Sequence, residues 1–159
     1  MPESSRRVYA THVVRISKVI AAPLGYVYDW CTDYRADDGQ YTRSKPRFRV
    51  FRVSPDRIVR VRYLRRAAAP PSVAAEVIRL RPPDRWHLDQ IDESDLNTID
   101  YKLTRLGPRK TRLTLSFVER WMVPDFPPKA QWSRRSSGYW DGLVSAIERD
   151  YRTGRPAKR

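Results

Sequence analysis

Glu119 is the side chain whose position in the sequence points most directly to chemistry. The segment from Thr111 to Trp121 alternates with period two, and Glu119 falls on the same face as Leu115 and Phe117. A carboxylate on an apolar face is costly unless it is paired, hydrated or beside a cavity. Glu119 is therefore a candidate ligand anchor, or a general acid or base with a raised pKa. The alternatives are a bulge that turns it outward, or an ion pair with Arg79, Arg105 or Arg135.

Other reactive side chains are few and have no obvious partners. His87 alternates with Trp86 and is expected on the outer face of its strand, while His12 is expected at the surface near the start of the first strand. The single cysteine, Cys31, has no partner for an intrachain disulfide. The sequence contains no nucleophile elbow and no glycine-rich phosphate loop. We therefore expect neither a metal site nor a cofactor.

Charge is distributed in blocks. The chain has 32 Lys and Arg against 18 Asp and Glu, a net charge of +14, and residues 43–66 alone hold ten basic side chains and one acidic one. Alternation in this block places Arg60 and Arg62 opposite Val59 and Val61, which predicts a basic outer surface. Such a surface suits nucleic acid, an anionic lipid or an acidic protein, and the alternative is a solvated face that keeps the protein soluble. The candidate surface residues are Arg47, Arg49, Arg52, Arg60, Arg62, Arg65 and Arg66.

The elements that position these residues begin with a strand and a short helix. Residues 12–19 alternate as in a strand, and Pro23 suits the first turn of a helix. Residues from Leu24 to Cys31 then follow helical spacing, and Asp33 to Asp38 are expected to add another turn that stops at Gly39. The sequence thus predicts a strand followed by one or two short helices.

Six short runs, separated by turn residues, follow this opening and predict an antiparallel meander. Their expected bounds are 47–53, 57–65, 73–81, 86–92, 98–106 and 111–121. After Pro128 the apolar spacing becomes helical again, which predicts a long helix from Lys129 to Arg152. A length of 159 residues suits one domain over 1–159, with a core over about 10–152 and a basic tail at 153–159.

The predicted architecture is α+β, with a seven-stranded antiparallel sheet covered by one long C-terminal helix. This order of elements resembles the START/SRPBCC superfamily and its helix-grip fold. The segment Ser17 to Trp30 is similar to the family's opening of strand, Ala-Pro and a helix with Val and an aromatic residue, and Asp33 follows. Gly107 to Thr114 resembles the family's Gly-x-x-x-Thr-x-Leu-x turn into the last strand. The resemblance covers nearly the whole chain.

The resemblance implies a cavity between the curved sheet and the long helix, where family members hold lipids, sterols, polyketides or other apolar molecules. Inward residues of the late strands and of the helix would line it, and ordinary core packing is the alternative for each apolar one. The candidates are Trp86, Leu88, Gln90, Tyr101, Leu103, Leu115, Phe117, Glu119, Trp121, Tyr139, Trp140 and Leu143.

Three functions follow as hypotheses. The first is a protein that binds an apolar, lipid-like or aromatic small molecule in this cavity. The second is an enzyme similar to the polyketide cyclases, in which Glu119, Tyr101 or Arg79 would assist proton transfer. The third is a module that binds nucleic acid or an anionic membrane surface through residues 43–66. No apolar stretch approaches the roughly 20 residues of a membrane span, and the N-terminus is too polar for a secretory signal, so we expect a cytoplasmic protein.

Overall fold

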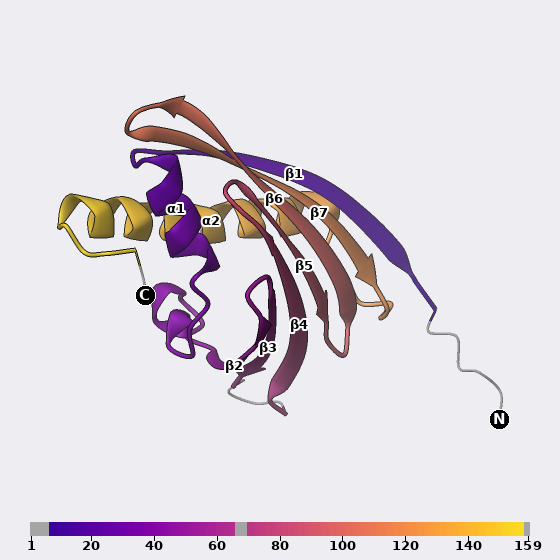
Figure 1. Cartoon of the computed structure of the whole chain (residues 1–159). Coiled ribbons are helices and arrows are strands. Elements are labelled where there is room, and N and C mark those ends of the chain that lie inside the picture. The colour runs from indigo at the N-terminus through magenta and orange to yellow at the C-terminus, as the bar shows by residue number, and fades with distance from the viewer. Residues whose placement is uncertain (1–6, 66–69, 158–159) are drawn as a thin grey trace.

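The computed structural model describes residues 7–65 and 70–157. Seven strands, two α-helices and one short 3-10 helix follow one another in the predicted order (Figure 1). Their bounds are β1 Ala10–Ile20, α1 Leu24–Thr32, η1 Asp38–Tyr41, β2 Arg47–Ser54, β3 Arg57–Leu64, β4 Ser72–Arg81, β5 Arg85–Ile91, β6 Asp95–Gly107, β7 Lys110–Trp121 and α2 Lys129–Arg152.

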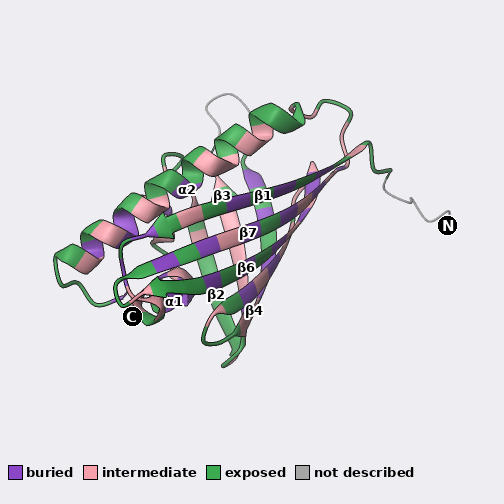
Figure 2. Cartoon of the chain, turned by 90° about the horizontal axis from the view of Figure 1, so that it is seen from above, coloured by how far each residue is buried: buried purple, intermediate pink, exposed green. Residues whose placement is uncertain are grey.

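The seven strands form one antiparallel sheet in the order β1-β7-β6-β5-β4-β3-β2. The sheet curves strongly, and α2 runs along its concave side (Figure 1). Buried and exposed residues alternate along the strands, as Figure 2 shows for the central part of the sheet. The α+β architecture predicted from the periods is therefore confirmed, including the bounds of the long helix.

The two halves of α2 differ in burial. Near its C-terminus Ala146, Ile147 and Asp150 are buried. Asp150 accepts a hydrogen bond from the indole nitrogen of Trp30 on α1 at 3.1 Å, which ties the two helices together. In the N-terminal half only Trp140 is buried among the residues from Lys129 to Trp140. One half of α2 thus completes the core, whereas the other half stands over the hollow of the sheet.

The segment after α1 differs from the prediction. The helical turns expected over 33–38 do not form, and Gly39 does not end a helix but lies inside η1. A Cβ on Gly39 would lie 1.8 Å from the backbone oxygen of Pro46, so no other residue fits there without movement of the backbone. This close approach folds residues 38–46 against the end of the sheet. Glycine is required at position 39 because the backbone of Pro46 lies so close, and not because a helix ends there.

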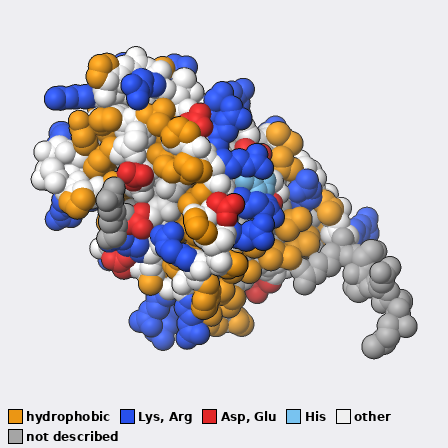
Figure 3. Space-filling view, in the orientation of Figure 1, with side chains coloured by type: hydrophobic (Ala, Val, Ile, Leu, Met, Phe, Trp, Pro, Cys, Tyr) orange, Lys and Arg blue, Asp and Glu red, His pale blue; other side chains and the backbone are white. Residues whose placement is uncertain are grey.

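The basic surface predicted for residues 43–66 forms only in part. Arg47, Arg49 and Arg65 are exposed, and Arg66 lies outside the described residues. Arg52 is exposed but bonds to Asp33 at 3.2 Å. Arg60 and Arg62 were placed on the wrong face, because both line a cavity on the concave side. Figure 3 shows Lys and Arg side chains in separate groups on the face in view, one of them around a histidine near its middle.

Candidate functional site

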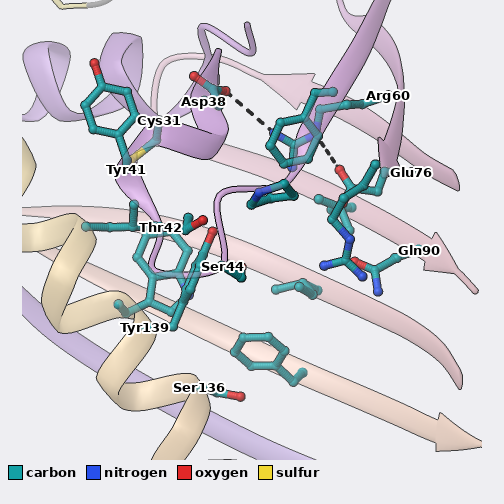
Figure 4. Close-up of a pocket in the computed structure, with 18 of the residues that line it drawn as sticks. Cys31, Asp38, Tyr41, Thr42, Ser44, Arg60, Glu76, Gln90, Ser136 and Tyr139 are labelled. Carbon is teal, nitrogen blue, oxygen red and sulfur yellow. Dashed lines mark hydrogen bonds and ion pairs between the residues drawn. The ribbon is translucent and has the colours of Figure 1, made fainter. Parts of the chain in front are cut away.

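A cavity of about 660 Å³ lies between the concave face of the sheet, the N-terminal half of α2 and residues 30–48. All five tryptophans of the sequence line it. Figure 4 shows Ser136 and Tyr139 extending from α2 on one side, and Arg60, Glu76 and Gln90 extending from the sheet on the other. The space therefore has an aromatic lining, with polar groups on both the sheet side and the α2 side.

Most of the predicted cavity residues lie where they were expected. Three do not line the cavity: Leu103 and Leu115 are packed in the core, and Glu119 is buried against Asp95. The predicted candidates that do line it are Trp86, Leu88, Gln90, Tyr101, Phe117, Trp121, Tyr139, Trp140 and Leu143.

The aromatic wall is built around Trp86 and Tyr101. These neighbours on β5 and β6 stack with ring centroids 4.6 Å apart and an angle of 8° between the planes. The ring of Trp140 on α2 lies 5.9 Å from that of Tyr101. Burial raises the pKa of the Tyr101 phenol well above its usual value, so this side chain stays neutral at physiological pH. The wall thus consists of closely packed aromatic side chains.

Two adjacent rows of side chains cross the concave face of the sheet. Each row runs through β1, β7, β6, β5, β4 and β3, with every member directly opposite the next one, and the rows are two residues apart on each strand. The first, which we call the apolar row, consists of Val14, Phe117, Ile99, Leu88, Ile78 and Ile58. The second, which we call the polar row, consists of His12, Glu119, Asn97, Gln90, Glu76 and Arg60.

Arg60 and Glu76 form an ion pair at the β3 end of the polar row. The Arg60 Nε donates to Glu76 Oε2 at 2.5 Å, and Arg60 Nη1 lies 3.6 Å from Asp38 Oδ2 (Figure 4). The guanidinium also packs on the ring of Phe48, with 4.1 Å from its carbon to the ring centroid. One cation therefore faces two carboxylates and an aromatic ring, which lets these charges stay at the cavity wall away from bulk water.

Glu119 and Asp95 form a carboxyl pair near the other end of the polar row. Burial, and then the charge of Asp95 and the hydrogen bond to it, raise the pKa of Glu119 to about 9. Burial also raises the pKa of Asp95. The two groups therefore hold a proton between them at neutral pH. Within the part of the chain that the structure describes, Glu119 Oε2, Asp95 Oδ1 and Asn97 Oδ1 have no hydrogen-bond partner.

Comparison with solved structures gives the fold. Protein-family models and curated proteins were also compared with the chain, and neither comparison found a match. The ZhuI aromatase/cyclase from Streptomyces sp. R1128 superposes with a TM-score of 0.69 at 10% identity, over 89% of this chain and 96% of that one. A START superfamily protein from Mycobacterium smegmatis gives 0.65 at 13% identity, over 86% and 94%. The structure of Ara h 8.0201 gives 0.66 at 9% identity, over 87% of this chain and 98% of that one.

The chain has the helix-grip fold. The resemblance of its opening segment and of its last turn to START/SRPBCC proteins thus agrees with the three-dimensional comparison. Because all of these identities are far below 25%, the likeness establishes the fold and leaves the ligand of this helix-grip chain to be argued from its own residues.

Several cavity residues of this helix-grip structure were missed at the sequence level. The expectation that valines point inward reversed the two faces of β3, whose concave residues are Ile58, Arg60, Arg62 and Leu64. Glu76 carried a usable signal, since it shares parity with the buried Ile78 as Glu119 does with Phe117. The residues of the α1 to β2 segment that line the cavity carried no such signal, and they are Trp30, Cys31, Tyr34, Asp38, Tyr41, Thr42, Ser44 and Pro46.

The histidines and the suggested catalytic residues are not assembled into one site. His12 is buried, contrary to expectation, and accepts a hydrogen bond from the Trp121 indole at 3.3 Å. His87 faces outward, as predicted, between Asp89 and Asp100. Arg79 bonds to Asp89 at 2.8 Å on the convex face, so it cannot act with Tyr101 in the cavity. Glu119 has no ion pair with the arginines suggested for it, among the residues described.

Two further searches concern the described residues only. Over 7–65 and 70–157, no group of three His, Cys, Asp or Glu side chains is placed to hold a metal ion. Neither helix in this part of the chain is long and apolar enough to cross a membrane.

Proposed function

We propose that this protein binds a mostly aromatic or apolar small molecule in the helix-grip cavity. The observation that carries the proposal is a cavity of about 660 Å³ lined by all five tryptophans. Ligand pockets commonly measure about 300–1,000 Å³ and combine apolar walls with a few polar groups. The stacked rings of Trp86 and Tyr101, with Trp140 beside them, give the cavity an apolar aromatic wall against which an aromatic ligand can pack.

The polar row supports a ligand with one neutral hydrogen-bonding group. Gln90 lines the cavity, and its side chain has no hydrogen bond to another described residue. Of its two neighbours in the row, Glu76 is engaged with Arg60, and Asn97 does not line the cavity. Because the Arg60 charge is balanced by two carboxylates, a charged ligand group gains little there. A hydroxyl or carbonyl of the ligand can instead bond to the Gln90 amide.

Binding is favoured over catalysis by the positions of the ionisable side chains. Of the three residues suggested for proton transfer, only Tyr101 lines the cavity. Its raised pKa makes it a poor base at neutral pH. A carrier or binding protein needs only the shape, the apolar walls and the polar anchor that these residues supply.

Filling the cavity tests the proposal. Ser136 lines the cavity from α2, whereas Ser145 is exposed on the same helix, so Ser136→Trp and Ser145→Trp form a matched pair. The protein is purified without detergent, and native mass spectrometry measures the small molecules that it retains. We expect a retained apolar compound in the wild type and in Ser145→Trp, and its loss in Ser136→Trp. Equal retention in both variants, or an empty wild type that binds no aromatic probe, would contradict the proposal.

A further inference from the structure

A second groove, of about 290 Å³, lies on the convex face of the sheet. It lies on the other side of the sheet from the cavity, and only Trp86 and Tyr101 belong to the lining of both. Four basic side chains from the four strands β1, β4, β5 and β6 converge on it, together with two hydroxyls and a histidine. These residues are Arg15, Arg81, Arg85, Lys102, Thr114, Ser116 and His87.

Three of the basic residues are direct cross-strand neighbours. Lys102 on β6 is opposite Arg85 on β5, and Arg85 is in turn opposite Arg81 on β4. Like charges directly opposite each other destabilise a sheet. A row of three such charges therefore lowers the stability of the free protein, and a bound anion would remove this repulsion.

The acidic side chains near the groove do not neutralise these cations. Asp100, which itself lines the groove, hydrogen-bonds to His87 Nδ1 at 2.7 Å, and Asp89 bonds to Arg79 at 2.8 Å. Among the residues described, Arg81, Arg85 and Lys102 form no ion pair with a carboxylate. The groove thus keeps a local excess of positive charge that an anion from solution can meet.

The groups present match the chemistry of a phosphate. Guanidinium groups bind phosphate oxygens through two parallel hydrogen bonds, and a lysine ammonium adds a compact charge. The hydroxyls of Thr114 and Ser116 lie on the neighbouring strand, where Thr114 is directly opposite Lys102. The two aromatic residues of the groove, Trp86 and Tyr101, turn their rings to the concave side, which leaves no exposed ring for stacking a nucleic-acid base.

We propose that the convex groove binds one phosphate group, carried by a small phosphate ester, by free phosphate or by a lipid headgroup. This site is independent of the cavity, so a ligand on one face of the sheet leaves the other face accessible. Its position gives the +14 chain a specific anion site in place of the outer surface expected from residues 43–66.

The test compares two double variants that remove the same charge. Arg85→Gln with Lys102→Gln removes two cations of the groove, whereas Arg109→Gln with Lys110→Gln removes two exposed cations in the hairpin between β6 and β7. Melting temperature and calorimetry are measured in inorganic phosphate and in chloride at equal ionic strength. Phosphate should stabilise the wild type and the control, and its affinity should fall at least about tenfold in the groove variant.

Without phosphate, the groove variant should melt at a higher temperature than the control, because the like-charge row is gone. This result also shows that the variant folds. Vesicles of phosphatidylcholine with and without phosphatidic acid separate the two sources of the phosphate. Binding to phosphatidic acid vesicles alone, lost only in the groove variant, would assign the groove to a headgroup.

Three outcomes would overturn the proposal. The first is an equal response to phosphate in the wild type and the groove variant. The second is no response of the wild type either to inorganic phosphate or to phosphatidic acid vesicles. The third is tight binding of single-stranded RNA that both double variants weaken equally, which would indicate a diffuse polyanion surface.

Discussion

The apolar row and the polar row cross the same strands, on the same face, two residues apart, and yet they differ in almost every side chain. All six residues of the apolar row are buried hydrocarbons or a phenyl ring. The polar row has two carboxyl groups, two amides, an imidazole and a guanidinium in the equivalent places. Sheet geometry does not explain this difference, since both rows share it. Arg60, Glu76 and Gln90 of the polar row line the cavity, whereas His12, Glu119 and Asn97 do not. The half of the polar row on β3, β4 and β5 is therefore the half placed to contact a ligand.

The two rows also contribute to stability in opposite ways. Apolar burial stabilises by about 25 cal/mol per Å², whereas polar groups taken out of water are costly unless they are bonded. The polar row reduces this cost by pairing Arg60 with Glu76 and by keeping a proton on the pair Glu119 and Asp95. We therefore expect the apolar row to contribute most of the stability. We expect the polar row to contribute little stability and to serve ligand recognition.

The largest effect is expected when one partner of the buried ion pair is removed. Glu76→Leu leaves the Arg60 cation with Asp38 alone at 3.6 Å, and should lower the free energy of unfolding by about 3–5 kcal/mol. Arg60→Met with Glu76→Leu should restore most of this loss, because a well-packed apolar pair replaces both charges. Urea denaturation of the three proteins measures the difference. A double variant as unstable as Glu76→Leu would mean that the polar row holds the fold after all.

The next effect concerns the apolar row on the same strand. Ile78 is fully buried two residues from Glu76, and Ile78→Ala should lower the free energy of unfolding by about 2–4 kcal/mol. A second substitution at the opposite residue, Leu88, to a smaller side chain should not restore the stability lost in Ile78→Ala, in contrast to the double variant of the ion pair. The measurement is again urea denaturation, and a loss below about 1 kcal/mol would remove the energetic distinction between the rows.

A pH-dependent effect, smaller per pH unit than either of these losses, is expected at Glu119. Its pKa is about 9 in the folded protein against an ordinary value of 4.5, so the folded state holds a proton that the unfolded chain releases. Stability should therefore fall as pH rises from about 5 to 9, by up to about 1.4 kcal/mol per pH unit. Glu119→Gln keeps the shape without the proton exchange and should flatten this slope.

The matched control for this pH series is Asp125→Asn, an exposed carboxylate that should leave the slope unchanged. Denaturation at pH 5, 7 and 8.5 measures all three proteins. A wild type whose stability does not fall with pH over this interval would contradict the protonated state of the pair Glu119 and Asp95.

The sequence predicted those parts of the fold in which local period and local composition agree. The period changes at Pro23 and Pro128 marked both α-helices, and the bounds of α2 were predicted correctly. Alternation in β5 and β7 placed Trp86 and Phe117 on the inner face, where both line the cavity. These predictions succeeded because each rests on residues close together in the chain.

The polar row could not be assembled from the sequence, because its members meet only through the register of six strands. On β3 the usual rule that apolar side chains face the interior fails. Val59 and Val61 face the convex side, and Arg60 faces the cavity. The pairing of Glu119 with Asp95 was also not predicted. Asp95 was expected in a turn before the strand 98–106, whereas it is the first residue of β6. Polar residues that meet across strands are thus the least predictable part of this site.

The central claim is that Gln90 of the polar row recognises a neutral polar group on a ligand whose body lies on the aromatic wall. Calorimetric titration with biphenyl and with 4-phenylphenol tests it, since the two probes differ by one hydroxyl. The variant Gln90→Leu keeps the size of the side chain and removes its hydrogen bonds, and should change the stability by no more than about 1 kcal/mol.

We expect the wild type to bind 4-phenylphenol about three- to tenfold more tightly than biphenyl, the range that one neutral hydrogen bond supplies. Gln90→Leu should abolish this preference and bind biphenyl at least as tightly as the wild type does. Equal affinity of the wild type for the two probes, or an unchanged preference in Gln90→Leu, would contradict the claim.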